Sequence, residues 1–388
     1  MKFRQLLIMF LLFRLFDLAI IFLSRFFIPY LGFFPYKEIA LEYNLPRILT
    51  ALANFDGAHY LLIAEQGYYQ YQQAFFPLYP LLIRLLSPVF PNNRLITALV
   101  ISNLSFLFGL WLFRKYLLEI GNSKLDIWPL IFLMAFPTSF FFGAVYTEGL
   151  FFLLVAGTFY YLKKERSYVT AIFSFLASLT RIVGVFLVIP ILITQISNLK
   201  SQNHNSKVKS FIEYLITPLA PVLGLTFYSL YLWKSTGDPL FFLHSQWAFG
   251  ANRSSSIVLL PQVVYRYLHI FFTANWNFQY FIALFEFAIF AFVLSILILD
   301  LVKNLELKSV SDLSWERVGI NLFSLSNLLL PTLTGTLSSI PRYALFSLSF
   351  FLFLSQLKNN LTKVVIVCIF TILHLILLGF FAQGYFIS

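Results

Sequence analysis

Apolar runs long enough to cross a lipid bilayer recur along almost the whole chain, and they constrain the fold more than any other feature. A transmembrane helix needs roughly 20 apolar residues. The first such run covers residues 5–27. Of the 388 residues, 60% are hydrophobic and only 11% are charged, which is too little charge to cover a soluble protein of this size. The sequence therefore predicts an all-α polytopic membrane protein.

About eleven spans are expected. Two apolar runs are too long for a single crossing and carry polar residues near their middle. Residues 127–162 are interrupted at Tyr146-Thr147-Glu148, and residues 168–199 are interrupted at Thr180-Arg181. We interpret each run as two spans that meet at an outer turn. The other spans are expected at residues 95–113, 212–233, 278–301, 318–334, 343–356 and 364–381.

Basic residues indicate the orientation of these spans. Lys2 and Arg4 precede the first span, and no small-residue cleavage site follows it, so we expect it to be retained with a cytoplasmic N-terminus. Most Lys and Arg residues then fall in the loops expected inside, as the positive-inside rule requires. The C-terminus is expected outside. The net charge of +11 is scattered beside apolar runs, which argues against a nucleic-acid partner.

Two long segments are expected on the outer side, at residues 28–93 and 234–277. Within the first, residues 75–90 are apolar but short, and contain Pro77, Pro80 and Pro88. We expect an interfacial or re-entrant helix there. The sequence has no obvious repeat and no soluble domain, so residues 1–388 are interpreted as one integral-membrane domain.

The first outer segment contains the stretch NFDGAHYLLIAEQGYYQYQQAFFPLYPLLIR, which is long, aromatic and sparsely charged. Such a composition is typical of a segment that lies at a membrane surface with a few polar groups turned to a ligand. Asp56 stands next to Gly57, where the backbone and a ligand can approach closely. A structural alternative is that Asp56 only caps a short helix whose first turn is Gly57-Ala58-His59.

Polar residues from distant parts of the chain are expected at this same outer boundary. A charge near the bilayer is costly and normally has a partner or a ligand. Two arginines and two carboxylates at one depth indicate a site for a phosphate-bearing ligand near the headgroups. The alternative is that the two arginines reach out to anionic lipid. The residues concerned are Asp56, His59, Glu148, Arg181, Gln246 and Arg342.

Other polar residues are expected to be structural. Arg14 and Asp17 are spaced i,i+3 on the first span and are predicted to form an ion pair. His374 is predicted to bond to a neighbouring helix. The single cysteine, Cys368, excludes an intramolecular disulfide. The sequence shows no metal-ligand histidine spacing, Gly-rich phosphate loop or nucleophile elbow. A soluble sugar-nucleotide fold is also absent, so any sugar donor would have to arrive within the membrane.

Several motifs then resemble one family in the same order. They are FDGAHYLLIAEQGY with AFFPLYPLLIRLL, PTSFFFGAVYTEGLFFLL, ASLTRIVGVFLVIP, GDPLFFLHSQWAFG and SIPRYALF. They resemble the GPI mannosyltransferase II (PIG-V-like) family and its bacterial relatives, which are integral-membrane glycosyltransferases of the GT-C class. Phe55 stands where tryptophan is expected. The resemblance implies a GT-C-like bundle with interfacial helices in the first outer loop, and a plasma-membrane location in a bacterium.

The resemblance also implies a polyprenyl-phosphate sugar donor and an extracytoplasmic site, with Asp56 as the catalytic carboxylate, Glu148 as the second acidic position and Arg181 near the lipid phosphate. We therefore expect transfer of a hexose, with mannose as the expected sugar, to a glycan, glycolipid or protein hydroxyl. Asp56 would be the general base of an inverting transfer, assisted by Glu148 and His59. Arg181 and Arg342 would bind the donor phosphate. The expected substrate contacts are Tyr60, Tyr79 and Gln246.

Two alternatives stay open at this point. The two carboxylates could hold a divalent cation, although no cofactor is expected. The protein could instead be a transporter or flippase of lipid-linked sugars, which would predict inverted repeats and polar residues near the middle of the membrane.

Overall fold

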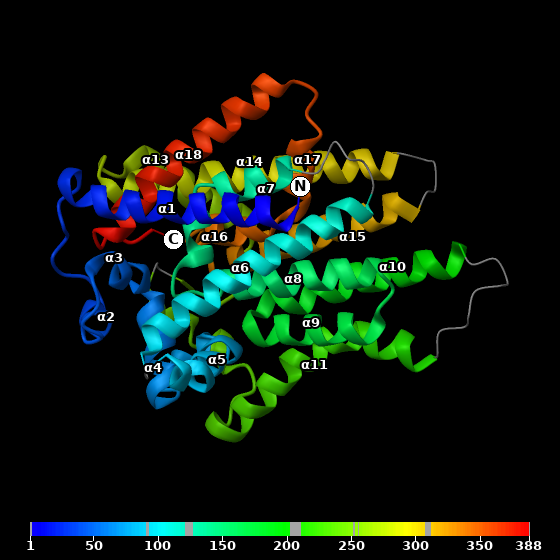
Figure 1. Cartoon of the computed structure of the whole chain (residues 1–388), viewed down its shortest axis with the longest axis horizontal. Helices are drawn as coiled ribbons and strands as arrows, with labels where there is room; N and C mark the ends of the chain where they lie inside the picture. The colour runs from blue at the N-terminus through cyan, green and yellow to red at the C-terminus, as the bar shows by residue number, and fades with distance from the viewer. Residues whose placement is uncertain are drawn as a thin grey trace.

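The computed structural model describes residues 2–90, 93–120, 127–201, 211–250, 253–254, 256–306 and 312–387. Every regular element in these residues is a helix, which confirms the all-α prediction (Figure 1). Five of the described helices are long and apolar enough to cross a membrane. They are α1 (Phe3–Phe27), α6 (Arg94–Glu119), α11 (Phe211–Thr236), α14 (Phe278–Glu306) and α18 (Asn360–Ala382). The number of about eleven spans stays a prediction.

The two long apolar runs are broken where the sequence predicts. The first contains α7 (Trp128–Ala135), the 3-10 helix η4 (Ser139–Gly143) and α8 (Glu148–Lys163). The second contains α9 (Ser167–Thr180), η5 (Ile182–Leu187) and α10 (Val188–Ser201). Both breaks are thus confirmed, because α8 begins at Glu148 and α9 ends at Thr180.

The last third of the chain is broken in the same way. It contains α15 (Asp312–Leu329), η7 (Leu330–Thr334), α16 (Ile340–Tyr343), η8 (Ala344–Phe346) and α17 (Leu348–Ser355). The turn between η7 and α16 therefore separates the two spans that the sequence predicts at residues 318–334 and 343–356. This turn brings Arg342 on α16 into the interior, where the side chain is buried.

The two predicted outer segments form short helices. The first holds α2 (Lys37–Leu41), α3 (Arg47–Thr50), η1 (Ala51–Ala53), α4 (Asp56–Gln66), η2 (Gln72–Ala74), α5 (Leu78–Leu86) and η3 (Ser87–Val89). The second holds α12 (Phe241–His244), η6 (Gln246–Phe249) and α13 (Leu260–Thr273). In Figure 1, α2 to α5 gather at the end of the bundle where α1 finishes and α6 begins. A helix is therefore present within residues 75–90, while its interfacial position stays a prediction.

Helices α6 and α8 pack closely because glycines lie between them. A Cβ atom at Gly149 would lie 2.4 Å from the carbonyl oxygen of Ser102 and 2.6 Å from that of Phe142. A Cβ atom at Gly109 would lie 3.1 Å from the backbone of Leu153. Small residues let the backbones of membrane helices approach closely. Helices α6 and α8 therefore form a tightly packed pair, and Glu148 is the first residue of α8.

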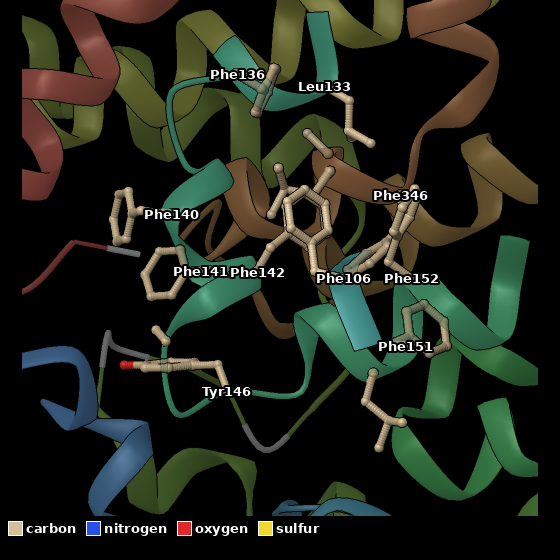
Figure 2. Packing of buried hydrophobic residues seen from close by; sticks show 14 of the residues in the cluster. Phe106, Leu133, Phe136, Phe140, Phe141, Phe142, Tyr146, Phe151, Phe152 and Phe346 are labelled. Atoms are coloured by element: carbon tan, nitrogen blue, oxygen red, sulfur yellow. The ribbon is translucent and has the colours of Figure 1, made fainter. Parts of the chain in front are cut away.

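A cluster of phenylalanine side chains fills the space behind η4 (Figure 2). Phe140, Phe141 and Phe142 are consecutive and fully buried. The Phe142 ring stacks on Phe106 of α6 with 4.3 Å between centroids. It also contacts Phe152 of α8 at 5.3 Å. The three rings of η4 fix the turn that leads to Glu148, because close-packed rings leave little room for movement.

The two structural predictions for the first and last spans are confirmed. Arg14 Nη1 lies 2.6 Å from Asp17 Oδ2 within α1. His374 Nε2 of α18 lies 2.8 Å from Asp17 Oδ1. The buried carboxylate therefore joins α1 to α18, as expected for a polar group in an apolar surrounding.

Candidate active site

Asp56 is the first residue of α4, directly after a residue in an unusual conformation. Phe55 has φ 59° and ψ −114°, a region that non-glycine residues rarely occupy. Its ring packs 5.4 Å from Phe34 and 5.2 Å from Phe386, so tertiary contacts hold the strained backbone. The N-cap position belongs to Phe55 and no side chain caps the helix. The capping interpretation of Asp56 is therefore wrong, because its carboxylate forms an ion pair instead.

The N-terminus of α4 packs against the turn that precedes Glu148. The Tyr146 hydroxyl donates a hydrogen bond to the Asn54 carbonyl oxygen at 2.7 Å. A Cβ atom at Gly57 would lie 3.2 Å from the carbonyl oxygen of Val145. Gly57 thus allows the first turn of α4 to approach this backbone, which places Asp56 and Glu148 in one site.

Asp56, Glu148, Arg181 and Arg342 form one ion-pair cluster. Arg342 Nη1 lies 2.7 Å from Asp56 Oδ2, and Arg342 Nη2 lies 2.9 Å from Glu148 Oε1. Arg181 Nη1 lies 2.8 Å from the same Glu148 oxygen. Two cations and two anions give a formal charge of zero. Glu148 and both arginines are buried, whereas the Asp56 side chain is 27% exposed. Asp56 is therefore the member that a ligand can reach.

Aromatic rings hold the two guanidinium groups in place. Arg342 lies 4.8 Å from the ring centre of Phe141 and 4.7 Å from that of Tyr146. Arg181 lies 4.6 Å from the ring centre of Tyr343. Cation–π contacts of this kind stabilise a cation that has been taken out of water. Phe141 of η4 therefore belongs both to the phenylalanine cluster and to the surroundings of Arg342.

Glu148 keeps one unsatisfied oxygen. Its Oε1 atom accepts hydrogen bonds from both arginines. Among the described residues, its Oε2 atom is buried and has no hydrogen-bond partner. A buried acceptor in that state costs roughly 1–3 kcal/mol.

His59 lies one helical turn after Asp56 and is enclosed by rings. Its ring centre lies 4.3 Å from that of Tyr36 and 5.0 Å from that of Phe75. Its Nδ1 atom lies 3.4 Å from Nε2 of Gln72. The structure therefore brings His59 beside Asp56, without a direct hydrogen bond between the two side chains in the described contacts.

The charges of these two residues follow from their surroundings. Burial lowers the pKa of His59, and the negative charge of Asp56 only partly opposes this. Burial has the largest single effect on Asp56 and would raise its pKa, but the charge and hydrogen bond of Arg342, together with the smaller effects of His59 and Arg253, hold that pKa below its usual range. Near neutral pH, the site therefore contains a neutral His59 and an ionised Asp56.

The three predicted substrate contacts occupy different positions. The Tyr60 ring is buried and packs 5.2 Å from the ring of Tyr79. The Tyr79 hydroxyl lies 2.7 Å from Ser102 Oγ and donates to the Ala98 carbonyl oxygen at 3.1 Å. Tyr79 is fully buried, so the structure gives it a supporting position beneath Tyr60. Substrate contact by these residues stays a prediction.

Gln246 leads to a residue that the sequence analysis missed. Its Oε1 atom accepts a hydrogen bond from Arg253 Nη1 at 3.1 Å. Arg253 Nη2 donates to Ser339 Oγ at 3.3 Å, three residues before Arg342. The positive charge of Arg253 also helps to lower the pKa of Asp56. A signal was present, because Arg253 is the only Lys or Arg between Lys234 and Arg266.

Metal ligands do not gather in the part of the chain that the structure describes: no three His, Cys, Asp or Glu side chains come together there as a cation site would require. Asp56 and Glu148 are instead bridged by Arg342. A divalent cation in this site stays an untested alternative.

Comparisons with known proteins agree with the motifs. Residues 4–250 match the family described as Mannosyltransferase (PIG-V). Among curated proteins, the chain is similar to GPI alpha-1,6-mannosyltransferase 2 of Cricetulus griseus, with 29% identity over 153 residues. This match covers 37% of the present chain and 31% of the hamster protein. The matched family segment contains Asp56, Glu148 and Arg181 and ends before Arg342.

Proposed function

Because the chain belongs to the mannosyltransferase (PIG-V) family of glycosyltransferases, we propose that it transfers mannose from a polyprenyl-phosphate donor to a hydroxyl acceptor. The transfer takes place on the extracytoplasmic side and inverts the anomeric centre. The family match favours this enzyme over a transporter of lipid-linked sugars. A glycan, glycolipid or protein can supply the hydroxyl group.

One observation carries this proposal: Asp56 is partly exposed and forms an ion pair with an arginine that also holds a second carboxylate. An ionised carboxylate can accept the proton of the attacking hydroxyl. The hydroxyl oxygen then bonds to the anomeric carbon as the bond to the phosphate oxygen breaks. The products are the mannosylated acceptor and the polyprenyl phosphate.

The arginines meet the charge of the leaving phosphate. In the structure, Arg342 is shared between Asp56 and Glu148. A donor phosphate competes with Asp56 for this guanidinium, and the release of Arg342 raises the basicity of Asp56 when the acceptor is present. Donor binding and activation of the base are thereby coupled. Arg181 stays on Glu148 and keeps the second cation close to the phosphate.

Arg253 adds the charge that the ion-pair cluster lacks. The four members of the cluster are formally neutral together, and a phosphate brings further negative charge. Arg253 is half-buried and donates hydrogen bonds to Gln246 and to Ser339, which lies three residues before Arg342. We assign it to the donor phosphate with Arg181 and Arg342, since charge-assisted hydrogen bonds are stronger than neutral ones.

The remaining residues orient the acceptor. Glu148 is buried and pairs with both arginines, so we assign it an orienting role that acts through Arg181 and Arg342. His59 is neutral and fixes the face of α4 that carries Asp56. We assign substrate contact to Tyr60 and Gln246, and the Tyr79 ring packs against that of Tyr60.

The test is a transfer assay with the purified protein in proteoliposomes. Polyprenyl-phosphate mannose, polyprenyl-phosphate glucose and GDP-mannose are supplied separately with a mannoside acceptor. We expect transfer from polyprenyl-phosphate mannose, and an α to β or β to α change at the anomeric carbon by NMR. Transfer from GDP-mannose, or retention of configuration, would overturn the proposal.

A further inference from the structure

A cavity of about 1270 Å³ lies beside the ion-pair cluster, between α13, the first turns of α14 and the C-terminal segment. These elements lie close to α1 and α18 in Figure 1. The cavity is lined by Phe55, whose next residue is Asp56. It is also lined by Thr336 and Ser338, in the turn before α16, which carries Arg342. The cavity lining therefore includes a direct sequence neighbour of Asp56 and a residue four positions before Arg342, although neither charged residue is itself part of the lining.

The wall formed by α13 and α14 is polar and well ordered by hydrogen bonds. Glu286 lines the cavity, and its Oε2 atom accepts a hydrogen bond from the Tyr267 hydroxyl at 2.7 Å. The Tyr267 oxygen in turn accepts a hydrogen bond from the Leu337 backbone N–H at 3.0 Å. Glu286 is 5% exposed, so this carboxylate is fixed rather than solvated. A fixed carboxylate is a strong acceptor for ligand hydroxyl groups.

The charge of the lining argues against the donor phosphate. Arg266 lines the cavity and donates from Nη1 to the Gly335 carbonyl oxygen at 3.1 Å, but its single positive charge is balanced by the carboxylate of Glu286 in the same lining. Glu286 faces the same space, and an anion beside a buried carboxylate is repelled. The donor phosphate is better matched by the arginines of the ion-pair cluster.

A hydrocarbon chain is also a poor match. A carboxylate in contact with lipid tails is costly. Aromatic rings from Phe34, Phe278 and Tyr385 line the cavity together with the amides of Asn277 and Gln279. Aromatic faces with a few fixed polar groups are what a hydroxyl-rich ligand requires, since its C–H faces stack and its hydroxyls bond.

We propose that this cavity binds the acceptor, as a neutral glycan of more than one sugar residue whose terminal hydroxyl points to Asp56. Its volume exceeds the roughly 300–1,000 Å³ of ordinary small-molecule sites, which leaves room for several sugar rings. The proposal rests on the proposed function, because it names the acceptor class of the same site. Donor and acceptor then approach Asp56 from opposite sides, with the phosphate on the arginines and the glycan along α13 and α14.

The test measures binding of mannotriose by the purified full-length protein in detergent, by titration calorimetry with no donor present. We expect Glu286→Gln to weaken binding about tenfold or more, because a charge-assisted hydrogen bond is lost. Glu306→Gln is the matched control, since it makes the same change at the other end of α14. Ala283→Phe places a ring inside the cavity and should abolish binding even if Glu286 contributes little.

The outcomes separate this proposal from the proposed function. Failure of the wild-type protein to bind mannotriose, or unchanged binding by both cavity variants, would overturn the proposal. Displacement of mannotriose by farnesyl phosphate, together with loss of farnesyl phosphate binding in Ala283→Phe, would identify a lipid groove instead and also overturn it. Because no donor is present, failure of the polyprenyl-phosphate assay leaves the binding result unaffected.

Discussion

Arg342 Nη1 lies 2.7 Å from Asp56 Oδ2, although 286 residues separate the two along the chain. This contact joins the first outer segment to α16. It also lowers the pKa of Asp56 while it occupies the carboxylate, so in the proposed mechanism the base and the phosphate-binding cation neutralise each other until a donor arrives. The predictions below follow from this arrangement.

Asp56→Asn should reduce turnover by roughly 10²–10⁴-fold, because the amide cannot accept the proton of the acceptor hydroxyl. The melting temperature should change little, since Asn fits the same space and can still accept a hydrogen bond from Arg342. Glu65→Gln is the control, as Glu65 is an exposed carboxylate at the other end of α4. A folded Asp56→Asn protein with normal turnover would exclude Asp56 as the base.

Arg253→Ala and Arg181→Ala should differ in their effects on stability. Arg253 is half-buried and bonds to neutral side chains, so its removal should raise the KM for the donor with little change in melting temperature. Arg181 pairs with the buried Glu148, so its removal should also destabilise the fold, by up to about 3–5 kcal/mol. Donor kinetics and thermal unfolding of both variants provide the measurement. Normal donor kinetics in Arg253→Ala would remove it from the phosphate site.

His59 should make the protein less stable in mild acid. Its folded-state pKa lies below the unfolded value of 6.5. Above pH 6.5 both states are neutral and the residue contributes no pH dependence. As the pH falls below 6.5, His59 binds a proton in the unfolded state but not in the folded state. The free energy of unfolding therefore falls by up to about 1.4 kcal/mol per pH unit. The melting temperature should therefore fall between pH 6.5 and pH 5, and less steeply in His59→Gln.

Asp56, unlike His59, should contribute no pH dependence to stability between pH 6.5 and pH 5. Its folded-state pKa lies below the usual 3.8, so its contribution to stability is present above pH 3.8 and is lost only as the pH falls below that value. The acid limb of kcat/KM that belongs to Asp56 should thus lie below pH 4. A limb near pH 6 that persists in His59→Gln would contradict this assignment.

Cysteine labelling should test the predicted orientation. Cys368→Ser removes the single cysteine. In that background, Gln70→Cys should react with an impermeant thiol reagent in intact cells, whereas Lys358→Cys should react only after the membrane is opened. Both native side chains are exposed, so accessibility does not distinguish them. Labelling of Lys358→Cys in intact cells would contradict the predicted topology.

Gly149→Ala should destabilise the fold by roughly 1–3 kcal/mol, because the added methyl group meets two backbone carbonyl oxygens. Gly379→Ala is the matched control. A Cβ atom there lies 3.0 Å from the end of the Ile28 side chain, which can turn away. Thermal unfolding should separate the two variants, and equal melting temperatures would show that α6 and α8 can move apart freely.

The sequence predicted the features that depend on local composition. Charged residues within apolar runs marked the breaks at Glu148 and Arg181, because a polar interruption in a run too long for one crossing must lie near a membrane surface. The Arg14–Asp17 pair was predictable from its spacing along one helix. The candidate site residues Asp56, Glu148, Arg181 and Arg342 were identified together, although which side chain contacts which was not.

The rest required three-dimensional information. Arg342 contacts Asp56 only because η7 and the turn before α16 fold inward, which no local pattern specifies. The positive φ of Phe55 could not be predicted, since a phenylalanine rarely adopts it and tertiary packing enforces it. Arg253 was overlooked because a single arginine in a long segment outside the spans is usually solvated. The cavity beside α14 combines residues from six separate segments, so no single motif contains it.

The distance in sequence between Asp56 and Arg342 also bears on how the protein is made. Glu148 and Arg181 are 33 residues apart and can pair soon after they leave the ribosome. Asp56 must wait for 286 further residues, which at 5–20 residues per second takes roughly 15–60 seconds. During that time the first outer segment carries an unpaired carboxylate, and the site closes only when nearly the whole chain has been synthesised. A nascent chain released before Arg342 therefore lacks a finished site, whatever number of its helices have entered the membrane.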